Sequence, residues 1–372
     1  MKILHVFRTP VGGLFRHVRD LVRGQHQLGH EVGIVCDSIT GGNAADQMLS
    51  ETLPFCKLGI ERIAISRLPG LGDLAAAKST RLIAERLRAD IIHGHGAKGG
   101  LYGRLAAGPL GIPSVYTPHG GSLHYTWRSF PGALFLGVEW KLARMGSGMV
   151  FVCEYERKVF AKKIGLSGKP CEIIYNGLWL EEFRKVNPID GAADILFMGD
   201  MRQLKGVDLL LNAIALLRRK RNITANLVGD GPDLEKFQAL AKSLGLADSV
   251  HFPGRLPTAD ALTRGRLLVM PSRAESFPYV VLEAAAGEVP MIASDVGGIP
   301  EILPPENLCP PENIEALARH IEMALTVPDA IAKDAKQLSA LVATKFSAEK
   351  MALRVVDFYQ RLLHASRKLP RL

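Results

Sequence analysis

The chain has 372 residues, of which 47% are hydrophobic and 22% are charged. This length exceeds one typical domain core and predicts two domains, while the composition excludes a long disordered or low-complexity tract. The net charge of +9 suits partners that carry phosphate, anionic lipid or nucleic acid, and does not decide among them.

The N-terminal run MKILHVF is too short for a signal-peptide core and predicts a first buried strand. The most apolar stretch, residues 130–140, is interrupted by proline, glycine and glutamate, so no run reaches the ~20 apolar residues of a membrane helix. The five cysteines lack CxxC spacing, which predicts neither a zinc site nor a disulfide framework. We therefore expect a cytoplasmic protein that is soluble, or peripheral to a membrane at most.

Apolar runs of strand length recur in the first half of the chain, as KILHVF, VGIVC, DIIHGH, SVYT, MVFVC and EIIY. Stretches of helical period lie between them, and this alternation predicts a parallel sheet with crossover helices. One such helix is expected over residues 14–28, because its apolar residues fall on one face and Gly29 can end it. It directly follows an expected turn at Gly12-Gly13.

Polar, proline and glycine residues interrupt this pattern at 184–194, and a second alternating series follows, as ILFMG, ANLVGDG, VHFPG, LLVMP and MIAS. We place a linker there, between a Rossmann-like lobe at 1–183 and another at 193–346. The expected fold is two doubly wound α/β lobes that face each other across a cleft. Further helices are expected at 207–219, 232–244, 280–287 and, with a clear amphipathic pattern, 348–363.

Gly12 and Gly13 are the first candidate site. Without Cβ atoms they let a ligand approach the backbone at a helix N-terminus, whose N–H groups favour phosphate or sugar hydroxyls. A tight turn with no ligand is the alternative. The chain has neither GxGxxG at this turn nor GxxxxGK[ST] anywhere, which argues against a nicotinamide or P-loop site.

His119 is the second candidate, because it follows a predicted strand in the loop YTPHGG. Ligands of open α/β sheets bind at the C-terminal ends of strands. His93 and His95 compete for any such role, and a structural role for each histidine is the alternative. We rank His119 first because the surrounding proline and glycines expose it on a loop.

Arg202 and Lys205 share one loop between a predicted strand and a predicted helix. The guanidinium of Arg202 can bind two phosphate oxygens, and Lys205 can supply a point charge. A departing diphosphate needs such cations because its negative charge grows in the transition state. A solvated basic loop is the alternative.

The segment PSRAESFPYVVLEA also runs from strand to loop to helix. Pro278 suits the first helical turn, with Ser276 or Phe277 near the cap. Glu275 on the loop can bind a sugar, and Glu283 inside the helix can accept hydrogen bonds from a ribose. The free N–H groups at the helix start offer further contacts to sugar or phosphate.

Taken together, these segments resemble the retaining GT-B glycosyltransferases of the "glycosyl transferases group 1" family over essentially the whole chain. The matching pieces are, in order, Gly12-Gly13, TPHG (117–120), IIYNG (173–177), Lys205-Gly206, VGDGP (228–232), Glu275 with Glu283, and GGIPEI (297–302). Each piece is weak by itself, and their shared order and strand-to-helix settings make the joint signal strong.

The resemblance implies a first lobe that binds the acceptor and a second that binds a nucleoside-diphosphate sugar, with no metal or other cofactor. It implies that the last helix, within 347–366, crosses back to the first lobe. The resemblance implies that Gly12 and Gly13 contact the acceptor and that Gly13 also contacts the donor. It implies further donor contacts from Lys205 to the diphosphate, from Glu283 to the ribose, and from Ser276, Phe277 and Pro278 to sugar or phosphate. The catalytic residues that it implies are His119, Lys205 and Glu275.

Two departures from the family pattern concern the donor. The phosphate loop reads Gly199-Asp200 where the family commonly has Gly-Arg, and Arg202 is our proposed replacement for that arginine. Ser276 follows Glu275 where glycine is common, and its side chain can alter the sugar pocket. The donor class is therefore better defined than the donor.

The expected function is retaining hexosyl transfer from a nucleotide sugar to a glycan or lipid-linked acceptor, in exopolysaccharide or lipopolysaccharide biosynthesis. Basic clusters and family habit favour a peripheral position at the anionic inner membrane face. A nucleotide-sugar epimerase and a non-catalytic sugar-binding protein are the alternatives. A nucleic-acid partner is not expected, because the chain has no motif of that kind.

Overall fold

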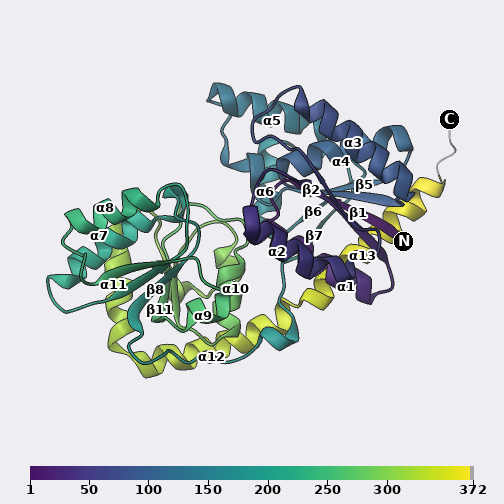
Figure 1. Ribbon diagram of the computed structural model, residues 1–372. Helices are drawn as coiled ribbons and strands as arrows, with labels where there is room; N and C mark the ends of the chain where they lie inside the picture. Colours follow the sequence, from purple (N-terminus) through teal and green to yellow (C-terminus); the bar gives the residue numbers. More distant parts are fainter. Residues whose placement is uncertain (369–372) are drawn as a thin grey trace. The chain divides into compact units, whose positions relative to one another are not determined.

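The computed structural model describes residues 1–368. The chain forms two compact units, one made of Met1–Asn176 and the chain from Ala348 onward, the other of Gly177–Ser347. Each has one parallel sheet covered by helices (Figure 1). The predicted α/β class with two parallel sheets is confirmed. Among the described residues, no helix combines the length and apolar character needed to cross a bilayer.

The strands of the first unit are β1 (Lys2–Val6), β2 (Glu31–Asp37), β3 (Ile60–Ile63), β4 (Ile91–His95), β5 (Ser114–Thr117), β6 (Gly148–Phe151) and β7 (Cys171–Ile173). Their order is β3-β2-β1-β4-β5-β6-β7. Strands β1 to β3 extend the sheet in one direction and β4 to β7 extend it in the other, so the switch point of the sheet lies between β1 and β4. The helices are α1 (Gly12–Gln27), α2 (Gly42–Thr52), α3 (Gly72–Leu87), α4 (Gly96–Leu110), α5 (Phe130–Leu142), α6 (Glu154–Lys163) and α13 (Ala348–Lys368).

Glycines let α4 lie unusually close to this sheet. A Cβ on Gly99 would come within 2.1 Å of the Val6 carbonyl oxygen, and one on Gly100 within 2.3 Å of the Tyr116 ring. Only a residue without a side chain permits this approach. The backbone of α4 therefore packs directly on β1 and fixes the ends of β1 and β4.

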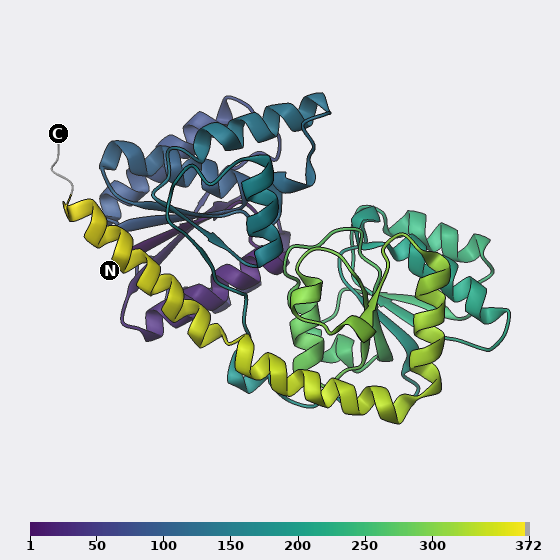
Figure 2. The same cartoon turned by 180° about the vertical axis from the view of Figure 1, so that it is seen from behind.

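The last helix, α13, completes the core of the first unit. Its apolar face packs on the sheet beside Ile3, Ile91 and Val150, and Figure 2 shows the helix in yellow along this unit. Phe358 and Tyr359 of this helix are buried. The amphipathic pattern expected at 348–363 is thus accounted for by packing on the first sheet.

The strands of the second unit are β8 (Ala193–Met198), β9 (Ala225–Val228), β10 (Val250–Gly254), β11 (Gly265–Met270), β12 (Met291–Ser294) and β13 (Leu308–Cys309). Their order is β10-β9-β8-β11-β12-β13. The helices are α7 (Val207–Arg218), α8 (Leu234–Ser243), α9 (Thr258–Leu262), α10 (Tyr279–Ala286), α11 (Ile314–Thr326) and α12 (Pro328–Lys345).

Two local details differ from the sequence expectation. Gly12 and Gly13 open α1, with Val11 as the extended N-cap, and do not form a separate turn before it. The polar segment 184–194 lies in the second unit, where the N–H of Val186 donates to Gly287 and that of Ile189 to Thr263. Backbone hydrogen bonding therefore ties this segment to the second unit despite its polar sequence.

Candidate active site

The site residues predicted in the second unit lie at the switch point of its sheet. Strand β8 pairs with β9 on one side and β11 on the other. Loops 199–206 and 271–278 follow β8 and β11, so both leave the same C-terminal edge. Doubly wound sheets bind ligands at this edge and at this point.

Lys205 and Glu275, from these two loops, form an ion pair. Nζ of Lys205 lies 2.6 Å from Oε1 of Glu275, which also accepts a hydrogen bond of 2.7 Å from Ser272. The Lys205 side chain is 23% exposed and that of Glu275 8%. A cation and a hydrogen-bond acceptor thus stand side by side, as a ligand with both phosphate and hydroxyl groups requires.

Two glycines bring the backbone into close contact at these loops, Gly206 between the two loops and Gly297 from a third loop that follows β12. Gly206 has a positive φ of 68°, and a Cβ there would lie 1.9 Å from the Pro271 oxygen. A Cβ on Gly297 would lie 2.0 Å from the Glu275 oxygen. These two positions accept only glycine, so the loops that carry Lys205 and Glu275 touch backbone to backbone.

Arg273 ties the same loops together, and sequence reasoning gave it no role. It donates two hydrogen bonds of 2.8 Å to Asp208, one of 2.7 Å to Glu312 and one of 2.6 Å to the Gln203 oxygen. Burial opposes ionisation of Asp208, but the Arg273 hydrogen bonds outweigh it and lower the pKa of Asp208. The partners of Arg273 lie 39 to 70 residues away from it in the sequence, so a local sequence pattern cannot reveal these contacts.

The start of α10 differs from the prediction. Pro278 is the N-cap and Tyr279 the first helical residue, so Pro278 does not occupy the first helical turn, and Ser276 and Phe277 precede the cap. Phe277 is buried, with its ring 5.3 Å from that of Phe346. Its side chain therefore belongs to the core, and only its backbone could contact a ligand.

Arg202 and Glu283 are the other two charged candidates of the second unit. Arg202 is exposed and caps the short helix η4 (Gln203–Lys205), where its carbonyl accepts from the N–H of Lys205. No hydrogen bond or ion pair of its side chain is found within residues 1–368. Glu283 is half-buried on α10, one turn beyond the helix start. The structure thus pairs Lys205 with Glu275 and leaves Arg202 as a solvent-facing cation on the same loop.

His119 in the first unit follows β5 in a left-handed backbone conformation, with φ of 54°. The buried Glu156 carboxylate holds this turn, because it accepts from the N–H of Gly120 at 2.6 Å and of Val152 at 3.0 Å. Desolvation of the His119 ring, and to a lesser extent the nearby His17, keep the pKa of His119 well below its usual value. At neutral pH His119 is therefore an uncharged hydrogen-bonding group.

The other candidates of the first unit are His93, His95, Gly12 and Gly13, and His95 lies beside His119. Nδ1 of His95 lies 3.2 Å from Nε2 of His119, so these two histidines, expected to compete for one role, are in contact. His93 bonds to Thr117 and Tyr359 and has a structural role. A Cβ on Gly12 or Gly13 would meet no atom within 4 Å, which leaves open space at the start of α1.

Two family models match adjacent parts of the chain. Residues 180–340 match "Glycosyl transferases group 1" and residues 11–182 match "Glycosyltransferase Family 4". Most of the second unit therefore belongs to the glycosyl transferases group 1 family and most of the first to glycosyltransferase family 4. The chain is a glycosyltransferase, as the resemblance predicted, and its fold is GT-B.

A curated glycosyltransferase is similar to most of this chain, and solved structures share its fold. The chain is 29% identical over 317 residues to D-inositol 3-phosphate glycosyltransferase of Streptomyces bingchenggensis, covering 75% of this chain and 68% of that one. It shares the fold of sucrose-phosphate synthase from Thermosynechococcus elongatus, with a TM-score of 0.82, 20% identity and coverage of 98% and 100%. Anabaena HepE, solved with UDP and glucose, gives a TM-score of 0.81, 21% identity and coverage of 97% and 100%.

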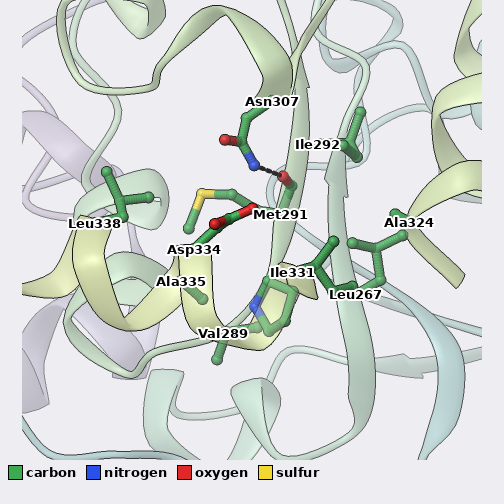
Figure 3. A pocket seen from close by; sticks show the side chains of 11 residues that line it. Leu267, Val289, Met291, Ile292, Asn307, Ala324, Ile331, Asp334, Ala335 and Leu338 are labelled. Carbon is green, nitrogen blue, oxygen red and sulfur yellow. Dashed lines mark hydrogen bonds between the residues drawn. The ribbon is translucent and has the colours of Figure 1, made fainter. Parts of the chain in front are cut away.

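A small cavity in the second unit of this glycosyltransferase is not part of the site (Figure 3). Its volume of about 20 Å³ and its mostly apolar lining, which includes Leu267, Met291 and Leu338, leave room for about one water molecule. It lies beside the first residues of β12, at the opposite end of the sheet from loops 199–206 and 271–278. A nucleotide sugar cannot bind there.

Proposed function

We propose that this glycosyltransferase moves a hexosyl group, with retention of configuration, from a nucleoside-diphosphate sugar to a glycan or lipid-linked acceptor. The observation that carries the proposal is the Lys205–Glu275 pair at the switch point of the second sheet. The UDP and glucose bound to Anabaena HepE support a uridine nucleotide and make UDP-glucose the first donor to test.

Each residue receives a role from its chemistry. The diphosphate draws Lys205 away from Glu275 and binds it together with Arg202 and the N–H groups at the start of α10, so that growing charge on the leaving group is stabilised. Glu275 then binds hydroxyls of the sugar, and Ser276 borders the same pocket. Glu283 accepts from the ribose. Lys205 therefore pairs with Glu275 in the absence of donor and with the diphosphate when donor is bound.

The first unit contributes the acceptor side in this proposal. Gly12 and Gly13 leave room at a helix N-terminus for the acceptor or a donor phosphate, and neutral His119 accepts or donates a hydrogen bond at the transferred sugar. No side chain is assigned as a nucleophile. The acceptor hydroxyl attacks from the face that the diphosphate leaves, and the diphosphate oxygen takes its proton, so the reaction needs no metal.

Lys205→Ala tests the donor site. We expect a transfer rate lower by about 10²–10³, the range for loss of one group that stabilises developing charge. Lys236→Ala is the matched control, because Lys236 is an exposed lysine that contacts the neighbouring Gln203; its rate should stay near wild type. Near-normal transfer by a folded Lys205→Ala variant would remove the diphosphate role of Lys205.

Product analysis separates transfer from the alternative activities. With donor and acceptor, NMR of the purified product should show the anomeric configuration of the donor; the opposite configuration contradicts retention. With donor alone, no new sugar isomer should form, and its appearance would support an epimerase. Binding of donor without any turnover over a panel of acceptors would favour a sugar-binding protein.

We further propose that α5 places the protein on the cytoplasmic, anionic face of a membrane, where lipid-linked intermediates of exopolysaccharide or lipopolysaccharide assembly are found. Phe130, Leu134 and Trp140 of this helix are exposed, Phe130 by 86%. The Arg144 guanidinium stacks 3.5 Å from the Trp140 ring centre, which places a cation beside the apolar side chains. Aromatic and apolar groups next to cations are typical of helices that lie in a membrane interface.

Vesicle flotation tests this placement. Wild-type protein should float with vesicles that contain anionic lipid and not with neutral ones, and Phe130→Ser/Leu134→Ser should lose most binding. Leu341→Ser is the control, because Leu341 is an exposed leucine of α12. Equal flotation of the double variant and wild type would contradict a role for α5.

A further inference from the structure

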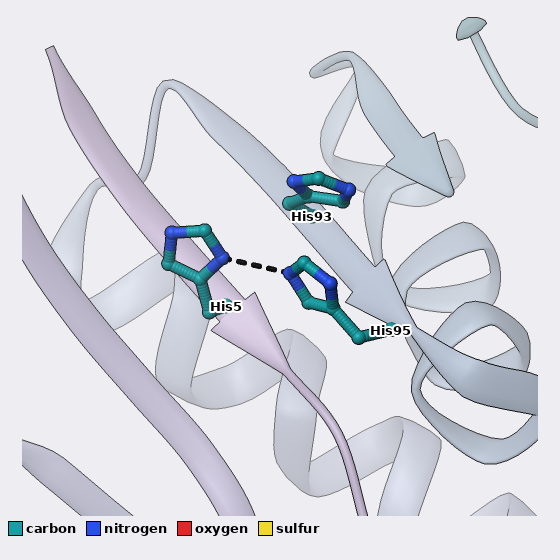
Figure 4. Close-up of side chains that lie close together, drawn as sticks. All are labelled: His5, His93 and His95. Carbon is teal, nitrogen blue, oxygen red and sulfur yellow. Dashed lines mark hydrogen bonds between the residues drawn. The ribbon is translucent and has the colours of Figure 1, made fainter. Parts of the chain in front are cut away.

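Five histidines meet at the switch point of the first sheet: His5 on β1, His93 and His95 on β4, His17 on α1, and His119 after β5. His5 stands opposite His93 in the strand register, and the rings of His93 and His95 lie 4.0 Å apart. Figure 4 shows His5 on one strand facing His93 and His95 on the next.

Two of the three histidines of Figure 4, His5 and His93, are not free to bind another group. Nδ1 of His5 lies 2.9 Å from Nε2 of His95, as the dashed line shows, and Nε2 of His5 lies 2.8 Å from Oε1 of Gln25. Nε2 of His93 bonds to Thr117 and its Nδ1 to Tyr359. Both nitrogens of His5 and both of His93 are therefore already used.

The neighbouring set of His17, His95 and His119 is different. Nδ1 of His17 donates to Oδ1 of Asn176 at 2.9 Å, so its Nε2 carries a lone pair. This Nε2 is buried and has no hydrogen-bond partner in the part of the chain that the structure describes. A buried ring nitrogen without a partner carries a free-energy penalty that a ligand can relieve.

A hydrogen-bonded chain gives His95 a lone pair on the same side. Because Oε1 of Gln25 can only accept, Nε2 of His5 carries the proton, and Nδ1 of His5 accepts from Nε2 of His95. Nδ1 of His95 is then the unprotonated nitrogen, and it faces Nε2 of His119 at 3.2 Å. Two lone pairs, on His17 and His95, therefore converge on His119.

We propose that Nε2 of His17, Nδ1 of His95 and Nε2 of His119 form a binding site for a divalent transition metal ion, with Zn²⁺ the best match. Two nitrogens bound to tetrahedral zinc at 2.0–2.1 Å are about 3.3 Å apart, close to the 3.2 Å between His95 and His119. One ring nitrogen from each of these three histidines lies within 4.8 Å of those of the other two, so only a small movement of the rings is needed to bring them onto one ion.

The surroundings of these rings suit a metal. Ligating histidines commonly hold their second nitrogen in a hydrogen bond that fixes the tautomer, as Asn176 does for His17 and His5 does for His95. On binding, His119 moves its proton from Nε2 to Nδ1, so the total number of protons is unchanged.

This site has a consequence that rests on the proposed function. A metal ion on Nε2 of His119 removes that nitrogen from contact with the transferred sugar. The ion is therefore an inhibitor and not a participant in transfer. Zn²⁺ should lower the transfer rate, and a chelator should restore it.

Metal titration of the whole chain tests the site. We expect one Co²⁺ per chain with the visible absorption of a tetrahedral ion, displaced by Zn²⁺. His17→Asn keeps a side-chain N–H toward Asn176 and removes the ligand atom, and it should weaken binding by at least tenfold. His251→Asn, at an exposed histidine of the second unit, is the control and should bind as wild type does. Unchanged affinity in His17→Asn, or absence of the tetrahedral absorption, would overturn the site.

Two further measurements keep the outcomes distinct. Histidine ¹⁵N shifts of the wild-type chain need no variant to fold, and Zn²⁺ should move those of His17, His95 and His119 while His30 stays unchanged; no change at these three contradicts the site. Co²⁺ binding without inhibition of transfer would leave the metal site standing and remove His119 from the proposed reaction. Inhibition that persists in a His17→Asn variant shown not to bind Co²⁺ would overturn the inhibitory role of this site.

Discussion

Gly206→Ala should damage both the stability of the second unit and transfer. The left-handed conformation of Gly206 costs an alanine about 1–2 kcal/mol. The new Cβ also lies more than 1 Å short of the 3.0 Å that such contacts need from the Pro271 oxygen, and relieving that overlap costs about 1–3 kcal/mol more. The strain forces loops 199–206 and 271–278 apart, and a displacement near 1 Å at a reacting centre can lower the rate by about 10²-fold.

Gly245→Ala separates the two contributions. Gly245 has a similar φ of 71° and no atom within 4 Å of an added Cβ, so only the conformational cost applies. Urea unfolding of both variants, followed by circular dichroism, gives the free energies, and initial rates with UDP-glucose give transfer. Equal loss of stability in the two variants, with normal transfer by Gly206→Ala, would refute the claim that loop contact positions Lys205 against Glu275.

Three other predictions follow from the contacts around the site. Arg273→Ala should lower the free energy of unfolding by about 1–3 kcal/mol, since the pair with Asp208 is partly exposed. It should also weaken donor binding. Thermal unfolding measures the stability and calorimetry the donor affinity, and an unchanged donor affinity would contradict the role of Arg273 in holding the loops. Glu156→Gln replaces a charged acceptor of the Gly120 N–H by a neutral one, should destabilise the His119 turn by about 1 kcal/mol and lower kcat; unchanged kcat would contradict this positioning role. The pKa values of His5, His17, His93, His95 and His119 lie below 6.5 in the folded state, chiefly because of desolvation, so the unfolded chain binds more protons and stability falls as pH drops below 6.5. At pH 5 His5 and His17, with pKa values of about 4 and about 3, each contribute about 2 kcal/mol of destabilisation. Acid titration followed by circular dichroism should show unfolding near that pH, and a chain stable at pH 4 would contradict the neutral state of these rings.

The sequence predicted most of the fold because its signal is local. Apolar runs separated by helical periods indicate parallel strands and crossovers, and both sheets contain them. The boundaries that differ depend on backbone choices that a pattern cannot rank. Gly12 and Gly13 suit a turn or a helix start equally well, and Pro278 suits an N-cap as well as a first helical turn.

The site was predicted in part for the same reason. Lys205 and Glu275 follow strands in loops and could be selected one by one, but their 2.6 Å contact joins positions 70 residues apart. His5 and His17 were missed because one reads as the interior of an apolar strand and the other as a helix face. The spacing of His93 and His95, two apart on one strand, places both on the same face of the sheet and was the one available signal for the cluster.

The final helix makes the first unit discontinuous in sequence. Residues 1–176 supply the sheet, and α13 closes its core only after the 171 residues of the second unit, Gly177–Ser347, have passed. During synthesis on the ribosome the second unit emerges whole and can fold at once. The first unit must wait, with the apolar surface around Ile3, Ile91 and Val150 open to solvent or to a chaperone. The first unit therefore begins synthesis before the second unit but completes its core after it.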